Sequence, residues 1–231
     1  MSEPAQVFIA VFAYSGVTPA TLDCLLRDLP RLPGVTYHRE SHDALISRSR
    51  SVAATEFLRS QSEILIMLDH DLSWQPGDLE RLIERVGETR AVVGGLYAKR
   101  GFGHGIALRF AEPGDHELGD DRLVRATYLA TGFFGVHRDV LQKLAGSLPL
   151  TSEDFWPFFL PVLTEPRHAG ERPEYLSEDW AFCQRAAAAG FELWVDLRPR
   201  LVHNGAHGFR VLDGQFELPS DDDRITLRSG P

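Results

Sequence analysis

Two carboxylates spaced two apart follow an unbroken apolar run. Ile64 to Leu68 leads directly into Asp69-His70-Asp71. The run predicts a strand buried on both faces, and if the extended conformation persists, Asp69 and Asp71 point to the same side. Converging carboxylates need a cation, a proton or strong donors between them, and oxygen ligands suit Mg²⁺ or Mn²⁺. The spacing favours a metal site, although an Asp after a strand also serves as a loop residue or helix cap.

A second acidic pair begins a predicted helix in the last third of the chain. Ser177 is suited to the N-cap, Glu178 and Asp179 fall in the first turn, and Gly190 follows the expected end of the helix. Acids at this place also complement the helix dipole, so the two residues equally fit a capping role. His203 stands at the glycine-flanked end of a later predicted strand, and its value as a ligand depends on whether it meets Asp71 in space.

Strands and helices alternate through the first part of the chain. Buried strands are expected at Val7 to Ala13, Val35 to His38, Ile64 to Leu68 and Ala91 to Gly95. Between them, the apolar spacing predicts three helices, the second over Ala44 to Leu58. This order predicts a parallel sheet covered by helices, with right-handed crossovers.

Two arginines, Arg48 and Arg50, lie in the second predicted helix. Composition favours a solvated helix face for both. Arginines near a strand end could instead hold a diphosphate.

The pattern changes beyond Gly95. The glycine-rich stretch 97–105 predicts a mobile loop, and Ile106 to Phe110 and Leu123 to Leu129 are expected to pair around an acidic turn, Glu112 to Asp121. The aromatic segment Phe155 to Pro161 fits the wall or lid of a site and fits a core plug equally well.

Composition narrows the class of protein. The chain has 231 residues, 43% of them hydrophobic and 25% charged, as in ordinary globular proteins. A net charge of -9 argues against general affinity for duplex nucleic acid. Cys24 and Cys183 lack metal-type spacing and are expected to be buried free thiols. No apolar stretch reaches the length of a bilayer span and no basic leader precedes Val7, so we expect a cytoplasmic protein.

Four segments, taken in order, resemble the GT-A glycosyltransferases, particularly their bacterial and phage family-2-like group. They are the opening strand with Ala13-Tyr14; Leu68 to Asp71, similar to the Asp-x-Asp motif; the glycine-rich Ala130 to Val136 with Arg138 and Val140-Leu141; and Ser177 to Cys183, followed by Gly190, Trp194 to Asp196 and His203 to Gly205. The resemblance covers residues 7 to 210.

The resemblance implies an α/β GT-A (Rossmann-like) fold with a mostly parallel central sheet flanked by helices and a smaller antiparallel acceptor-side portion. It implies a single domain over residues 1–217. The nucleotide-binding half covers 1–96, the acceptor-side half covers 97–217, and 218–231 is a loose C-terminal tail.

The resemblance also implies a hexosyltransferase-type enzyme that uses a nucleotide-diphospho-sugar donor, based on UDP or GDP, and a divalent cation, Mn²⁺ or Mg²⁺. The implied metal ligands are Asp69, Asp71 and His203, with His70 and His207 as further candidates. The implied nucleotide pocket comprises Ala13, Tyr14, Arg48, Asp69, His70 and Gly132. Asp179 is the implied general base, with Glu178 beside it.

Other functions share these features. A nucleotidyltransferase or a metal-dependent phosphohydrolase would use the same acids, but nucleotidyltransferases usually carry a glycine-rich phosphate loop after the first strand, and Ser15-Gly16 is a poor substitute. A non-catalytic nucleotide-sugar-binding module would not need Asp179. The acceptor stays open among a glycan, a lipid-linked sugar, a metabolite, a peptide and a modified nucleic-acid base, as does inversion or retention.

Overall fold

The computed structural model describes residues 6–99, 105–111, 116–118, 122–166, 168, 170–205, 208–210 and 227–229, and of 116–118, 208–210 and 227–229 the backbone alone. Most of the expected 97–105 loop, most of the acidic turn, His207 and most of the expected C-terminal tail lie outside these residues.

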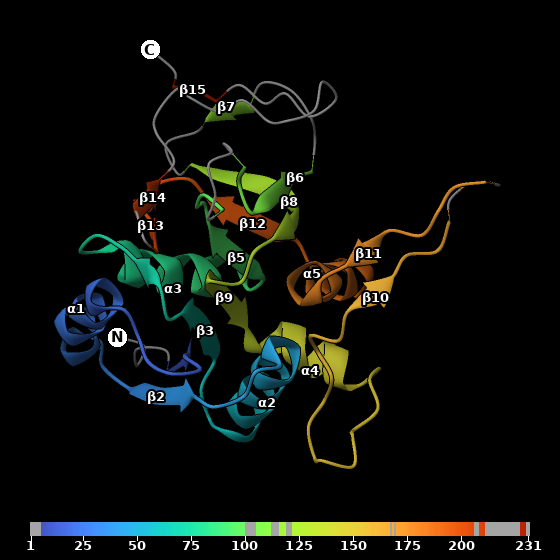
Figure 1. Ribbon diagram of the computed structural model, residues 1–231, viewed down its shortest axis with the longest axis horizontal. Coiled ribbons are helices and arrows are strands. Elements are labelled where there is room, and N and C mark those ends of the chain that lie inside the picture. Colours follow the sequence, from blue (N-terminus) through green and yellow to red (C-terminus); the bar gives the residue numbers. More distant parts are fainter. Residues whose placement is uncertain are drawn as a thin grey trace.

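An eight-stranded sheet forms the centre of the molecule (Figure 1). Its strands, in spatial order, are β2 (Val35–Glu40), β1 (Val7–Phe12), β3 (Ile64–Asp69), β9 (Phe133–His137), β5 (Val92–Gly95), β12 (Leu193–Asp196), β8 (Leu123–Leu129) and β6 (Leu108–Phe110). From the pairings, β9 and β8 run opposite to the other strands of this sheet. The expected α/β class with a mostly parallel sheet is therefore confirmed, as is the pairing of the strands at 106–110 and 123–129.

The order of the sheet differs from simple alternation at one place. The strands β3 and β5 follow each other in the alternating pattern, but β9 lies between them and pairs antiparallel with both. β9 comes from the glycine-rich segment of the second half of the chain. Both halves of the sequence therefore contribute to the middle of one sheet.

Helices cover both faces of the sheet. They are α1 (Pro19–Asp28), followed by a short 3₁₀ turn, η1 (Leu29–Arg31), α2 (Ile46–Arg59), α3 (Asp78–Thr89), α4 (Arg138–Ala145) and α5 (Glu178–Ala188). α1 and α3 lie on one face, and α2, α4 and α5 on the other (Figure 1). In β3, Leu65 and Met67 enter one core while Ile64, Ile66 and Leu68 enter the other, which explains the unbroken apolar run.

Two rings of the aromatic segment 155–161 plug the core. Phe158 and Phe159 are fully buried. The Phe159 ring stacks on Phe182 of α5 with centroids 4.5 Å apart. Because these rings are buried among core residues, they form no open wall or lid.

The described residues also form three small sheets. They are β14 (Gly208–Arg210), β13 (Val202–Asn204) and β4 (Leu72–Ser73); β10 (Val162–Leu163) with β11 (Tyr175–Leu176); and β15 (Leu227–Ser229) with β7 (His116–Leu118). β15 belongs to the tail that was expected to be loose, but its backbone pairs parallel with β7.

Two further expectations concern the cysteines and the membrane. Cys24 and Cys183 are buried free thiols, as expected. Burial raises the pKa of the Cys183 thiol to about 12. Among the helices of the described residues, none combines the length and apolar character needed to cross a bilayer.

Replacing Phe182 by alanine should lower the free energy of unfolding by about 3–5 kcal/mol, because its ring is fully buried against Phe159 and Phe134. Urea unfolding would measure the change. Leu26→Ala, at an exposed position of α1, is the control and should change stability by about 0.5 kcal/mol or less. Equal effects of the two substitutions would contradict the described core.

Candidate active site

The acidic segment turns immediately after β3. His70 and Asp71 form a turn between β3 and β4, so the extended conformation that would align Asp69 and Asp71 does not persist. The Asp71 side chain is buried, whereas that of His70 is 41% exposed. The two carboxylates therefore have different surroundings, and each meets its own set of partners.

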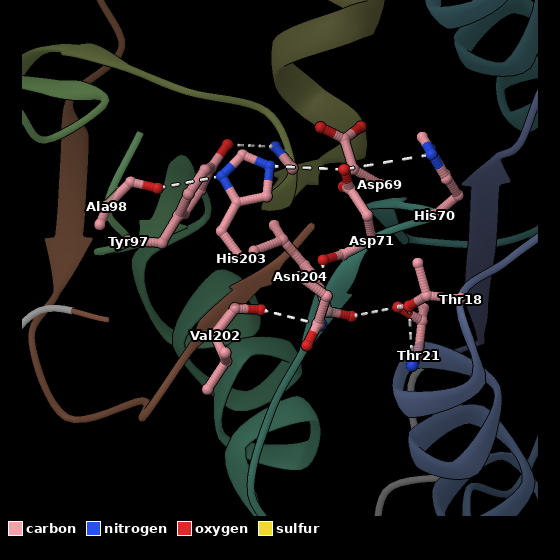
Figure 2. A network of polar contacts seen from close by, with 12 residues as sticks. Thr18, Thr21, Asp69, His70, Asp71, Tyr97, Ala98, Val202, His203 and Asn204 are labelled. Atoms are coloured by element: carbon pink, nitrogen blue, oxygen red, sulfur yellow. Dashed lines mark hydrogen bonds and ion pairs between the residues drawn. The ribbon is translucent and has the colours of Figure 1, made fainter. Parts of the chain in front are cut away.

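The turn that carries Asp71 is held from both sides (Figure 2). The backbone N–H and side-chain Nδ2 of Asn204 both donate to the Asp71 carbonyl, at 2.7 and 3.0 Å. On the other side, the Thr18 N–H donates to the His70 carbonyl and the Thr21 hydroxyl to the Leu72 carbonyl, both at 2.8 Å. These bonds leave the turn little freedom, so the position of the Asp71 carboxylate is set in advance.

His203 reaches Asp71 because β13 pairs with β4. Its Nε2 lies 3.5 Å from Asp71 Oδ2, and its Nδ1 lies 3.0 Å from the Ala98 carbonyl oxygen. A carbonyl only accepts, so Nδ1 carries a proton, and in the neutral imidazole Nε2 is the nitrogen with the lone pair that could bind a metal. The spatial meeting on which a ligand role of His203 depends is therefore present (Figure 2).

The Asp71–His203 pair fits a divalent cation. One carboxylate oxygen and one imidazole nitrogen 3.5 Å apart are close enough for one ion to contact both, since such ions bind these atoms at about 2.0–2.2 Å. The carbonyl behind the imidazole is the usual outer partner of a metal-binding histidine. His70 Nε2 lies 4.0 Å from the same carboxylate. Within the described ranges no three His, Cys, Asp or Glu side chains form a complete metal cluster.

Asp69 has partners of a different kind. Its Oδ1 accepts from Arg50 Nη2 at 2.8 Å. On its other side is Gly132, whose N–H donates to the Tyr97 hydroxyl at 2.9 Å. A Cβ atom at Gly132 would lie 2.8 Å from Asp69 Oδ2 and 2.7 Å from the Tyr97 hydroxyl oxygen. The close approach at Gly132 is therefore to the protein's own polar groups.

Tyr97 lies at the centre of this packing. Its buried ring stands edge-on to the His203 imidazole, with centroids 5.6 Å apart. Burial, together with the charge of Asp69, raises the pKa of the Tyr97 phenol well above its usual value. Tyr97 therefore stays protonated and acts as a neutral hydrogen-bonding group.

The expectation of a solvated face for Arg50 is wrong. The Arg50 side chain is 5% exposed and pairs with both Asp69, at 2.8 Å, and Glu178, at 2.6 Å. Burial disfavours its charge, but the two carboxylates outweigh that effect and raise the pKa of the guanidinium. Arg48 does lie on the outside, 44% exposed and paired with Asp43 at 2.8 Å.

The pair Glu178-Asp179 opens α5 as expected. Ser177 occupies the N-cap position, but its hydroxyl donates to Asp179 Oδ1 and does not cap the helix. The same oxygen accepts from the Trp180 N–H at 2.8 Å. Glu178 is held by Arg50, so the two acids differ: Glu178 belongs to an ion pair, whereas Asp179 is held by a hydroxyl and an amide.

The opening strand ends at the same edge of the sheet. Ala13 is buried and its N–H donates to the Glu40 carbonyl at 2.9 Å. Tyr14 is 60% exposed, and its ring faces His42 with centroids 6.5 Å apart. An exposed aromatic ring at the carboxyl end of a parallel strand is suited to stacking against a planar ligand.

Sequence reasoning did not foresee the contacts that three residues make here: Arg50, Tyr97 and Asn204. A signal for Arg50 was present, because Ala53, Ala54 and Phe57 follow it at helical spacing and all are buried. Neither Tyr97 nor Asn204 carried a comparable signal, since both act through partners far away in the sequence.

The model of the family described as Glycosyl transferase family 2 matches residues 18–145. No curated protein sequence matches the chain. The crystal structure of A197 from STIV is similar over 94% of this chain and 99% of that chain, with 15% identity and a TM-score of 0.61.

A second similar structure is that of GalNAc-T7 with UDP, GalNAc and Mn²⁺. It matches 87% of this chain with 14% identity and a TM-score of 0.51, and the chain spans 44% of its length. At this level of identity both structures bear on the fold alone.

Gly132→Ala should destabilise the protein by about 1–3 kcal/mol, because the new methyl group would press on Asp69, Tyr97 and Leu72, all within 3 Å. Gly146→Ala is the matched control: its backbone is right-handed helical and its Cβ would meet only ordinary contacts, so stability should stay the same or rise by about 0.4–1 kcal/mol. Thermal and urea unfolding would measure both, and a neutral Gly132→Ala would argue against the described packing.

Proposed function

The chain belongs to glycosyl transferase family 2 and has the GT-A fold, and we propose that it transfers a sugar from a nucleotide-diphospho-sugar to an acceptor hydroxyl with a divalent cation. The observation that carries this proposal is that Asp71 Oδ2 and His203 Nε2 lie 3.5 Å apart, just beyond the end of β3. The UDP and Mn²⁺ in the similar GalNAc-T7 structure are consistent with such a donor and ion.

In this proposal Asp71 and His203 hold Mn²⁺ or Mg²⁺. Asp69 faces the ion or the ribose through Oδ2, because Oδ1 is taken by Arg50. When bound, the cation would stabilise the negative charge that develops on the departing diphosphate. The protein's own task is to keep the ligand atoms in place, which the bonds to Ala98 and Asn204 do.

The nucleotide is proposed to bind where β1 and β3 end. Ala13 and Tyr14 come from the first of these ends, and His70 comes from the exposed turn after the second. Gly132 supplies backbone beside Asp69. Arg48 would reach the diphosphate only by leaving Asp43, which its exposed position on α2 permits. Residues 1–96 then form the nucleotide-binding half and 97–217 the acceptor-side half.

Asp179 is proposed as the general base. Its carboxylate would take the proton of the acceptor hydroxyl while that oxygen bonds to the anomeric carbon and the nucleoside diphosphate leaves. Glu178 is less suited to the task, because Arg50 holds its carboxylate at 2.6 Å. General base catalysis of this kind contributes a factor of about 10²–10⁴.

The donor and the ion are tested together by calorimetric titration of UDP, GDP, CDP and their common sugar conjugates, first with Mn²⁺ and then with EDTA. We expect metal-dependent binding of one nucleotide in the wild type and its loss in Asp71→Ala and His203→Ala, because each change removes one ligand atom. Asp23→Ala, at an exposed position of α1, is the control and should bind like the wild type. Unchanged Mn²⁺-dependent affinity in Asp71→Ala would refute the metal assignment.

Asp179→Asn should leave nucleotide affinity unchanged and lower turnover by about 10²–10⁴-fold, because the amide cannot accept the proton. Release of nucleoside diphosphate from the bound sugar nucleotide would be measured beside calorimetric affinity, with Asp23→Asn as the control. Full turnover in Asp179→Asn would remove this residue from the mechanism. A wild type that binds nucleotide but releases no nucleoside diphosphate would favour a binding module.

A further inference from the structure

One buried guanidinium connects the two acidic motifs of the site. Arg50 Nη2 donates to Asp69 at the end of β3, and Arg50 Nη1 donates to Glu178 at the start of α5, at 2.8 and 2.6 Å. Asp69 belongs to the proposed donor side and Glu178 to the proposed acceptor side. The two nitrogens are fixed relative to each other because the guanidinium is planar.

The Arg50 side chain is itself held in place. It is 5% exposed, and its guanidinium carbon lies 5.6 Å from the centroid of the Phe12 ring in β1. The neighbouring Ser49 and Ser51 are also buried, so this turn of α2 faces inward. A buried charge of this kind is stable only while its carboxylate partners stay close. Arg50 is therefore a fixed point to which both motifs are attached.

The position of Asp179 depends on that attachment. Asp179 follows Glu178 in the first turn of α5, and its own hydrogen bonds, with the Ser177 hydroxyl and the Trp180 N–H, are local to the same helix end. Among the contacts described above, the bond from Glu178 to Arg50 is the one that links this helix end to the donor side. Moving Glu178 would therefore move Asp179 relative to the donor.

We propose that Arg50 is a positioning residue that ties Asp69 to Glu178 and thereby sets where Asp179 stands relative to the donor. The proposal rests on the proposed glycosyl transfer. It differs from a role as diphosphate ligand, in which Arg50 would contact the donor itself. Arg50 Nε is buried and has no hydrogen-bond partner among the described residues.

The first test needs no substrate. It compares amide hydrogen exchange in the wild type with that in Arg50→Lys, Glu178→Gln and Arg59→Lys. In Arg50→Lys the positive charge is kept, but lysine lacks the planar guanidinium that bonds two carboxylates at once. The backbone amides of residues 64–72 and 176–183 should therefore both exchange about tenfold faster than in the wild type. Glu178→Gln should affect 176–183 alone. Arg59, on the same helix but at the surface and paired with Glu56 and Asp154, is the matched control and should leave exchange unchanged. Wild-type exchange of both segments in Arg50→Lys would overturn the proposal.

The second test separates positioning from donor binding. Release of UDP or GDP from UDP-glucose, UDP-N-acetylglucosamine and GDP-mannose would be followed with Mn²⁺, beside calorimetric affinity for UDP and GDP. In Arg50→Lys we expect kcat to fall about 10²-fold, as small misplacements of reacting groups do, with nucleotide affinity unchanged. Lower affinity with unchanged kcat would make Arg50 a donor ligand and overturn the proposal. Absence of nucleotide binding in the wild type would count against the proposed function instead. Hydrogen exchange would then still test whether Arg50 links Asp69 to Glu178.

Discussion

The structure depends on keeping several carboxylates together at one edge of a sheet. Like charges at close range are unfavourable unless each has a cation or hydrogen-bond donors. Arg50 serves Asp69 and Glu178 at once, the Asp71 carboxylate lies against His203, and Asp179 takes a hydroxyl and an amide. Hydrogen-bond donors thus compensate Asp69, Glu178 and Asp179, whereas Asp71 faces His203, so these chemically similar groups have different surroundings.

The insertion of β9 into the sheet brings these acids together. Because β9 lies between β3 and β5, the glycine that precedes it lies directly beside the end of β3. The Asp69 N–H donates to the Gly132 carbonyl at 2.9 Å, and the Gly132 N–H reaches Tyr97. Because Gly132 has no side chain, its backbone packs directly against Asp69, and the first and second halves of the chain are in contact there.

A second layer of contacts supports the Asp71 turn from α1. Trp74 donates its indole N–H to the buried Asp28 at 2.7 Å, and the Cys24 thiol bonds to the Trp74 backbone. Asp28 is held in turn by Arg27. Burial alone would raise the pKa of the Asp28 carboxyl, but the bonds from Arg27 and Trp74 lower it below its usual value, so the residue stays charged. The family model places the chain among glycosyl transferases, and these contacts explain how the short turn of the candidate site is held rigid.

The sequence alone determined the elements and the chemical candidates. Apolar runs predicted β1 and β3, helical spacing predicted α2 and α3, and cap residues predicted α5. The acids at the end of β3 and the start of α5 indicated the candidate site, because these signals are local. Tertiary structure decided which groups meet. The turn at His70 separated Asp69 from Asp71, the pairing of β13 with β4 brought His203 to Asp71, and the inward face of α2 turned Arg50 from an expected surface residue into the link between the two motifs. Such contacts join residues far apart in the chain, and their energies depend on burial and geometry that exist only after the chain has folded.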